Sequence, residues 1–310
     1  MSVHLLWDLD DLVEVYKDHQ RRTRGLRDRT LGNYERHVRA FVRGALGEDP
    51  VEPGRLTSPD VLAFFASMTA TYSPASMKAV RTALRSFLRY LRAQGIGDGR
   101  LEAAIPRVAS WRLSTLPRRL TDQQLEQLLG SLEVSMSMPC GPRDRAIVWC
   151  LATLGLRPSE IAQLCLEDID WRAGTVTLGQ RKNRRGAVLP VPHEAGRALA
   201  DYLAEHRPST GQRRVFVQHV GLRRGEPITA TAVSEVVVRA LRRAGIDAPI
   251  GGAYVLRHTL ASRLVVQGAT LNEVADVLGH RDLDTAAIYA KVDLPALREV
   301  ALPWPGQVGR

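Results

Sequence analysis

The chain has 310 residues, of which 45% are hydrophobic, and a formal net charge of +10 at pH 7. That length and apolar content suffice for two domains, each with its own core. The positive charge favours an acidic polymer as partner, although composition alone does not choose between nucleic acid, a membrane surface and no partner. No apolar run reaches the roughly eighteen residues of a membrane-spanning helix, and the acidic first residues do not resemble a secretion signal. We therefore expect a cytoplasmic protein that does not enter a membrane.

The chain has three cysteines, and they lack both the paired spacing of a zinc site and the even number of a disulfide framework. We expect Cys140, Cys150 and Cys165 to be small buried apolar residues. No cluster of acidic residues suited to a divalent metal stands out, and we predict neither a metal nor an organic cofactor.

Apolar residues at helical spacing predict helices through the first 95 residues. An amphipathic lead-in occupies residues 1–20, and further helices begin at Thr30, after Ser58 and at Pro74. The basic run at residues 21–29 is either a solvated connection or a phosphate contact.

The helix that begins at Pro74 carries a basic stripe on one face. Its basic residues are spaced 3, 4, 4 and 3 apart. At about 100° per residue, this spacing places them within roughly 80° of arc. No acidic residue lies between Ser73 and Gly95 to compensate this charge. We therefore predict that the stripe follows the phosphates of a nucleic acid. It consists of Lys78, Arg81, Arg85, Arg89 and Arg92.

Residues 96–120 mix Gly, Pro and basic residues without periodicity, which predicts a connection between two domains. We place the first domain at residues 1–110, the linker at 111–120 and the second domain at 121–310. Both domains are expected to be mainly helical.

Within the second domain, the apolar pattern changes from helical to alternating at residues 176–191. This pattern predicts a β-hairpin with a basic tip that contains Lys182, and residues 215–217 predict a third short strand. The second domain is therefore expected to combine helices with a small antiparallel sheet.

Residues 253–289 are expected to fold as three short helices in one compact unit. The first helix has apolar residues every four positions and ends at Gly268. The second begins with a capping box of Thr270 and Glu273 and ends at Gly279. The polar residues that this packing gathers are Arg257, His258, His280 and Tyr289.

Together with Arg157 and Lys182, these side chains suit one chemistry. A phosphodiester under attack gains negative charge on its non-bridging oxygens, and guanidinium groups bind that charge bidentately. A tyrosine hydroxyl can form a covalent phosphoester. The set therefore predicts phosphoryl transfer with tyrosine as nucleophile and without a metal ion.

Four segments of the chain resemble the successive motif blocks of one enzyme family. They are TLGLRPSEIAQL at 153–164, GQRKNRRGAVLPV at 179–191, YVLRHTLAS at 254–262 and LGHRDLDTAAIY at 278–289. In this order and spacing they resemble the tyrosine recombinase, or phage integrase, family, particularly its Xer-like bacterial site-specific recombinases and transposases.

The resemblance implies a fold that is mainly α, with two domains. An N-terminal helical core-binding, SAM-like domain would grip DNA. An α+β catalytic domain with a small antiparallel sheet would follow it and end in a C-terminal tail that packs on a neighbouring subunit.

The resemblance also implies a role for each matching residue. Arg157 and Arg257 match the two catalytic arginines, and Glu160 matches the acidic residue that shapes the site of the first. Lys182 matches the lysine that protonates the leaving 5′ oxygen. His280 would donate a hydrogen bond to the scissile phosphate. Tyr289 would be the nucleophile that forms a 3′-phosphotyrosyl bond.

One position departs from the family pattern. Three residues before Arg257, where the family usually has His, stands Tyr254. A phenol can donate a hydrogen bond to a phosphate but does not titrate near neutrality as imidazole does. Because of its position alone we count Tyr254 among the catalytic residues. We expect His258 to pack in the core or to support the site.

The partner implied is double-stranded DNA with paired recombination sites, bound by a homo- or hetero-tetramer that the C-terminal tail joins. Further phosphate contacts are expected from the hairpin tip, at Arg181, Arg184 and Arg185. Two other readings remain: strand relaxation by a type IB topoisomerase, and a DNA-binding regulator without catalysis. The sequence does not separate integration, resolution and transposition of a mobile element.

Overall fold

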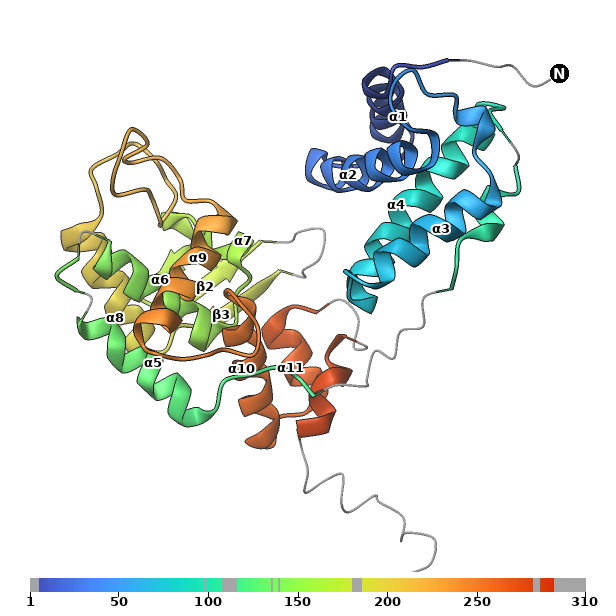
Figure 1. Ribbon diagram of the computed structural model, residues 1–310. Helices are drawn as coiled ribbons and strands as arrows, with labels where there is room; N and C mark the ends of the chain where they lie inside the picture. The colour runs from blue at the N-terminus through green and yellow to red at the C-terminus, as the bar shows by residue number, and fades with distance from the viewer. Residues whose placement is uncertain are drawn as a thin grey trace, which may run out of the picture. The chain divides into compact units, whose positions relative to one another are not determined.

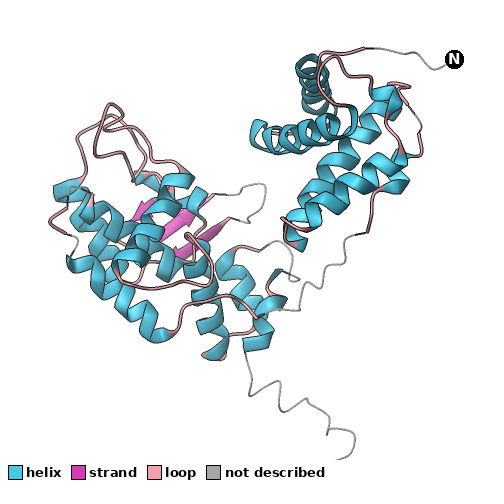
Figure 2. Cartoon of the chain, in the orientation of Figure 1, coloured by secondary structure: helices cyan, strands magenta, loops and turns pink. Residues whose placement is uncertain are grey.

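The computed structural model of the chain describes residues 6–97, 99–107, 116–134, 136–138, 140–179, 186–280 and 285–292. The chain divides into two compact units, Met1–Trp111 and Arg112–Arg310 (Figure 1). Helices dominate both units, and the strands of the described residues all lie in the second (Figure 2). The predicted class, mainly α with a small antiparallel sheet, is confirmed.

The described residues of the first unit form four helices and two short 3-10 turns. Asp8 caps the first helix by accepting a hydrogen bond from the Asp10 N–H, and Gly25 ends it in the left-handed conformation. This helix therefore takes in part of the basic run at 21–29. The elements are α1 (Leu9–Arg24), α2 (Asp28–Leu46), η1 (Pro53–Arg55), α3 (Ser58–Thr69), α4 (Pro74–Ala93) and η2 (Leu101–Ala104).

The core of the first unit is aromatic and lies between these helices. Tyr16 of α1 meets Phe87 of α4 edge to face with ring centroids 5.4 Å apart, and Phe41 of α2 meets Phe64 of α3 at 5.3 Å. α4 begins as predicted, because the Ser73 hydroxyl caps it and Pro74 occupies its first turn. Because Phe87 packs in this core, the apolar face of α4 points inward and its basic stripe points away from the core.

The segment expected to connect the domains is partly folded. Leu101 and Ile105 are buried in the core of the first unit, whereas Leu120 is buried in the core of the second. Most of residues 96–107 therefore belong structurally to the first unit. Residues 108–115 lie outside the described part of the chain.

The second unit places a small sheet among helices. Its helices are α5 (Asp122–Val134), α6 (Gly141–Leu154), α7 (Pro158–Ile161), α8 (His193–Asp201), α9 (Ala230–Arg243), α10 (Tyr254–Val266) and α11 (Leu271–Leu278). Shorter turns are η3 (Leu166–Asp168), the π-helical η4 (Tyr202–His206) and η6 (Ala287–Val292). The central helix is α6, which is buried along most of its length and contacts α5, α8, α9 and α10 (Figure 1).

The predicted hairpin is confirmed, and the sheet has one strand that the sequence did not reveal. The order is β1 (Ile169–Asp170), β2 (Thr175–Leu178) and β3 (Ala187–Pro190), all antiparallel, with Val176 opposite Leu189. The third strand predicted at 215–217 is wrong: these residues are buried, but Val217 makes only an isolated bridge to Pro227. These residues make single backbone bonds to neighbouring segments, as the Val215 N–H does to the Leu164 carbonyl, and their burial explains the apolar run.

Residues of α10, α11, η6 and the position just before η6 form a small core of their own. Its buried members are Ala261, Val265, Val274, Ala275, Leu278, Ala286 and Tyr289. The predicted compact unit at 253–289 is therefore present, with the ring of Tyr289 as its largest side chain. Among the helices of the described residues, none is long and apolar enough to cross a membrane.

Candidate active site

Arg257 lies at the centre of the site. It belongs to the first turns of α10 and is only 4% exposed. Its Nη1 donates to the Gly155 carbonyl at 2.5 Å and its Nη2 to the Leu278 carbonyl at 2.7 Å. Each carbonyl ends a helix, where the unsatisfied backbone oxygens favour a cation. One guanidinium thus ties the end of α6 to the end of α11.

Two glycines direct the chain into the site at these helix ends. Gly155 and Gly279 both have positive φ, 59° and 61°. A Cβ on Gly155 would lie 2.9 Å from the side chains of Leu260 and Leu278, so this close packing also requires glycine. Each glycine is followed within two residues by a predicted site residue, Arg157 or His280.

Arg157 is held by Glu160, the acidic residue that was expected to shape its site. The Arg157 Nη1 donates to Glu160 Oε1 at 2.9 Å, and the backbone N–H of Arg157 donates to Glu160 Oε2 at 2.8 Å. Glu160 is buried while Arg157 is partly exposed. A buried carboxylate that holds one edge of a guanidinium orients the rest of that group.

Tyr289 and His258 meet across two elements. The Tyr289 side chain is 1% exposed, and its Oη lies 2.9 Å from His258 Nδ1. Burial raises the pKa of Tyr289 to about 12, while the positive charges of Arg257 and then Arg157 act to lower it. Both arginines therefore lie close enough to act on the tyrosine oxygen.

His280 and Tyr254 differ in burial. His280 is partly buried directly after Gly279, and its backbone N–H donates to the Ala275 carbonyl at 2.8 Å. Tyr254 opens α10 and is 50% exposed. The structure thus brings Arg157, Arg257, His258 and Tyr289 into one electrostatic and hydrogen-bonded set, with His280 at the end of the helix that Arg257 holds.

The hairpin tip, residues 180–185, lies outside the described residues. The flanking strands end at Leu178 and begin at Ala187. The positions predicted there are Arg181, Lys182, Arg184 and Arg185.

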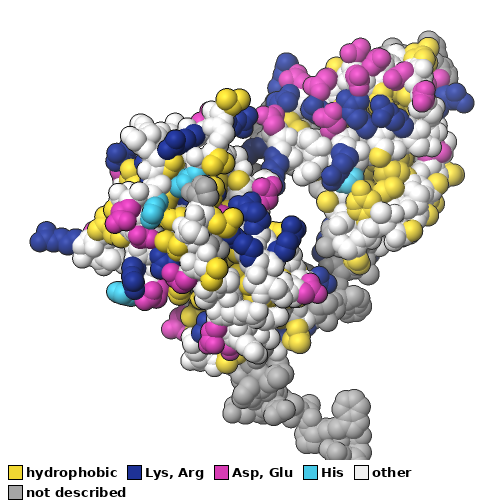
Figure 3. Space-filling view, turned by 60° about the vertical axis from the view of Figure 1, so that its left-hand side comes forward, with side chains coloured by type: hydrophobic (Ala, Val, Ile, Leu, Met, Phe, Trp, Pro, Cys, Tyr) yellow, Lys and Arg dark blue, Asp and Glu magenta, His cyan; other side chains and the backbone are white. Residues whose placement is uncertain are grey.

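The basic stripe on α4 is less uniform than its sequence indicates. Glu102 of η2 lies 3.1 Å from Arg89 and 3.5 Å from Arg92, so the expectation of an uncompensated stripe is wrong for its C-terminal half. In the part of the chain that the structure describes, no acidic side chain pairs with Lys78, Arg81 or Arg85. On the face shown in Figure 3, basic side chains lie on both units.

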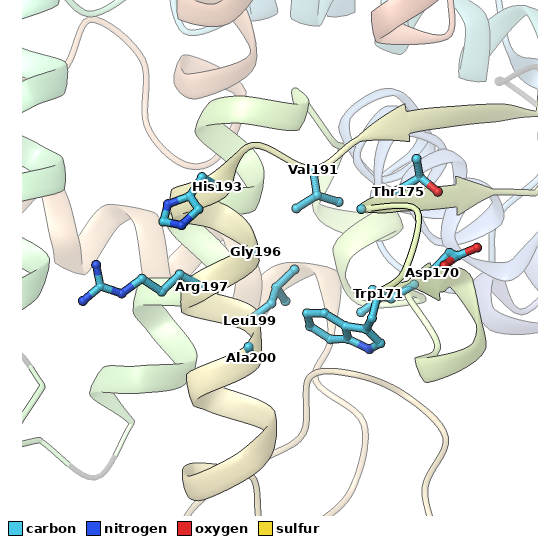
Figure 4. A pocket seen from close by; sticks show the side chains of 11 residues that line it. Asp170, Trp171, Thr175, Val191, His193, Gly196, Arg197, Leu199 and Ala200 are labelled. Atoms are coloured by element: carbon cyan, nitrogen blue, oxygen red, sulfur yellow. The ribbon is translucent and has the colours of Figure 1, made fainter.

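Two features of the second unit lie outside this set. A cavity of about 310 Å³ is lined by residues of β1, β2, α8 and the segments beside them, including Trp171, Thr175 and Leu199 (Figure 4). None of the predicted site residues lines it. Asp201, Glu205 and His206 are the group among the described residues whose atoms lie close enough together to hold a metal ion. The sequence did not reveal this group, in which Glu205 and His206 are exposed and Asp201 partly exposed. Asp201 already lies 3.6 Å from Arg145.

Comparison with known proteins now decides the family. The model of the phage integrase family matches residues 118–294, and the model of the phage integrase N-terminal SAM-like domain matches residues 13–95. The chain belongs to the phage integrase family. Its relatives include "Putative integrase/recombinase y4rA" of Sinorhizobium fredii, 42% identical over 95% of this chain and 71% of that protein. Tyrosine recombinase XerD of Listeria monocytogenes is 30% identical over 94% of this chain and 97% of XerD.

Solved recombinases share the fold. The site-specific recombinase XerH, bound to its palindromic difH substrate after cleavage, matches with a TM-score of 0.72 and 22% identity over 94% of this chain and 83% of that one. A lambda integrase tetramer on a Holliday junction matches with a TM-score of 0.69 and 19% identity, over 93% and 78%. The protein is a tyrosine recombinase, an enzyme of site-specific DNA breaking and rejoining.

Proposed function

We propose that Tyr289 is the nucleophile of this recombinase and forms a 3′-phosphotyrosyl bond with the cleaved strand. The observation that carries the proposal is the double contact of Arg257. Its guanidinium holds the ends of the two helices that precede Arg157 and His280, and its charge acts on the Tyr289 hydroxyl. Donors fixed in advance of the reaction stabilise developing charge without further reorganisation.

In this mechanism the remaining residues have separate tasks. Arg157, Arg257 and His280 stabilise the charge on the phosphate as Tyr289 attacks in line, and Lys182 gives a proton to the leaving 5′ oxygen. Glu160 keeps Arg157 in orientation. Tyr254 adds a hydrogen-bond donor at the exposed start of α10. The phosphotyrosine retains the energy of the broken bond, so rejoining needs no nucleotide.

DNA binding has to uncover the nucleophile. Tyr289 is buried against α10 and α11, and a buried oxygen cannot reach a phosphodiester on the outside of the protein. We propose that DNA binding exposes the Tyr289 hydroxyl through a small shift of its turn that keeps the oxygen within hydrogen-bond reach of His258.

The DNA grip is proposed to come from both units. The first domain, residues 1–110, would use the α4 stripe, and the catalytic domain, residues 121–310, would use the basic hairpin tip, with residues 111–120 joining them. The substrate would be double-stranded DNA with paired sites, held by a homo- or hetero-tetramer that the tail after residue 292 connects. The place of action would be the cytoplasm, where the DNA of a bacterial cell lies.

The direct test uses Tyr289→Phe. The probe is a nicked duplex that carries the sequence selected by the wild-type protein from random DNA, with the nick placed so that the cleaved fragment diffuses away. The wild-type protein should accumulate as a covalent DNA complex, and Tyr289→Phe should form none while binding the duplex equally well. Tyr202→Phe is the matched control, because it removes another buried tyrosine hydroxyl, one that bonds the Val217 N–H.

Cleavage by Tyr289→Phe at a rate near that of the control would refute the assignment. Strand exchange between two labelled sites supports recombination, whereas relaxation of supercoiled DNA without exchange would support religation of the same strand, as in a type IB topoisomerase. Binding without cleavage by the wild-type protein would favour a regulator.

A further inference from the structure

His258 makes a direct contact with the proposed nucleophile. Its Nδ1 lies 2.9 Å from the Tyr289 Oη, and the two ring centroids are 5.7 Å apart at an interplanar angle of 51°. The two residues are 31 positions apart in sequence, one on α10 and the other on η6. Packing of the small core around Tyr289, rather than local sequence, therefore creates this contact.

The direction of the hydrogen bond follows from the charge state of both groups. Burial, and then the nearby charge of Arg257, lowers the pKa of His258, so its imidazole is neutral at neutral pH. Burial raises the pKa of Tyr289 to about 12, so the phenol keeps its proton. A protonated phenol facing a neutral imidazole donates, and Nδ1 accepts, with the imidazole proton on Nε2.

Among the described residues of the neighbouring elements, the carboxylates are exposed, distant or already paired, as Glu160 is with Arg157. Glu273 and Asp276 of α11 are exposed, and Arg143, Asp144 and Arg145 lie in the first turn of α6, at the end opposite Gly155. Of the described residues, Arg257 acts on both members of the pair and Arg157 on Tyr289 alone.

The position three residues before Arg257 does not supply an imidazole. It holds Tyr254, which is half exposed at the start of α10. A protonated phenol has no basic nitrogen that could take up a proton as a neutral imidazole does. The imidazole in hydrogen-bond contact with the nucleophile is that of His258.

We propose that His258 is a catalytic residue that takes the proton of Tyr289 during cleavage and returns it during rejoining. The inference rests on the proposed function, because it requires Tyr289 as nucleophile. In cleavage, the O–H bond of Tyr289 breaks as its oxygen bonds to phosphorus, and the proton moves to His258 Nδ1. The bond from phosphorus to the 5′ oxygen breaks, and that oxygen takes a proton from Lys182. Rejoining runs these steps in reverse.

Two substitutions separate proton transfer from orientation. His258→Ala removes both functions, whereas His258→Gln keeps an acceptor for the phenol but cannot take its proton. On the nicked duplex described above, both variants should bind DNA as the wild type does and cleave about 10²- to 10⁴-fold more slowly in a single turnover. Cleavage by His258→Gln near the wild-type rate would reduce the residue to a positioning role. Faster cleavage by His258→Ala would mean that the contact restrains Tyr289; either result overturns the proposal.

Two further readouts identify which proton is affected. A duplex with sulfur in place of the bridging 5′ oxygen has a leaving group that needs no proton, so it should restore cleavage to Lys182→Ala and leave His258→Ala slow. The wild-type cleavage rate should be nearly flat between about pH 7 and 9, because His258 is already neutral there. The rate of His258→Ala should rise by up to about tenfold per pH unit over this range, since hydroxide then removes the proton. Rescue of His258→Ala by sulfur, or equal pH profiles, would contradict the assignment.

The outcomes separate this inference from the proposed function. Cleavage by Tyr289→Phe refutes the nucleophile itself. If Tyr289→Phe is inactive and both His258 variants cleave at the wild-type rate, only the role of His258 is refuted.

Discussion

Two sets of basic residues in this protein differ in how far they are buried and in how firmly their side chains are fixed. Arg257 is buried and fixed by two backbone carbonyls, and Arg157 is fixed by a buried carboxylate. The stripe on α4 instead lies at the surface of the first unit, where Lys78, Arg89 and Arg92 are exposed and Arg81 and Arg85 partly exposed. Glu102 balances part of its charge. Buried, fixed donors suit one transition-state geometry, whereas exposed charges act through their number and are screened by salt. The first set should therefore govern the rate of cleavage and the second the affinity for DNA.

The largest effect in this comparison should come from Arg257→Lys. Lysine keeps the charge but cannot span the carbonyls of Gly155 and Leu278 or bind a phosphate bidentately. We expect single-turnover cleavage to fall by about 10³-fold or more, with little change in DNA affinity. A similar loss of DNA affinity would show that Arg257 also contributes to DNA binding. That result would contradict the division between residues that govern rate and residues that govern affinity.

The next effect should follow from Glu160→Gln. The amide keeps the shape of the side chain but removes the charge that holds Arg157 at 2.9 Å. Cleavage should slow by about 10-fold to 10²-fold because Arg157 is less well oriented. Glu167→Gln is the control, since Glu167 also pairs with an arginine, Arg213, but on the exposed surface. An equal effect of both substitutions would contradict the orienting role.

The stripe is expected to change affinity and its salt dependence. Replacing Lys78, Arg81 and Arg85 together by Gln should weaken DNA binding and lower the slope of log affinity against log salt by about 2 to 3. Replacing Arg89 and Arg92 by Gln should have a smaller effect per residue, because Glu102 already pairs with both. Binding measured over a range of salt concentrations tests this, and equal effects per residue would rule out the distinction.

The smallest effect should be a gain in DNA affinity rather than a loss. Glu102→Gln releases Arg89 and Arg92 from their acidic partner and should tighten DNA binding by a few-fold at low salt, with a steeper salt slope. The cleavage rate of bound DNA should stay unchanged. Weaker binding would mean that Glu102 serves to position the two arginines for phosphate.

Local signals in the sequence predicted the parts of the site that local structure determines. Gly279 ends α11 in the left-handed conformation, and the Thr270 and Glu273 capping box starts it, both as expected. The motif blocks added the order of the site residues. They also indicated the family, which the comparisons confirm. The roles of the individual residues stay predictions.

Contacts between distant segments could not be predicted in the same way. Arg257 binds a carbonyl 102 residues away, and His258 meets Tyr289 across 31 residues. Glu102 comes from a segment that its composition marked as linker, and it reaches back to a helix with no acid of its own. Helical periodicity reports which face of one element is buried, but it does not report what packs against that face.

The most direct measurement is to identify the residue that carries the DNA. The covalent complex trapped on the nicked duplex is digested with protease and nuclease, and the peptide that bears the remaining nucleotide is sequenced by mass spectrometry. The account predicts a nucleotide on Tyr289. A nucleotide on Tyr254 or another residue, or cleaved DNA without any covalent peptide, would contradict it.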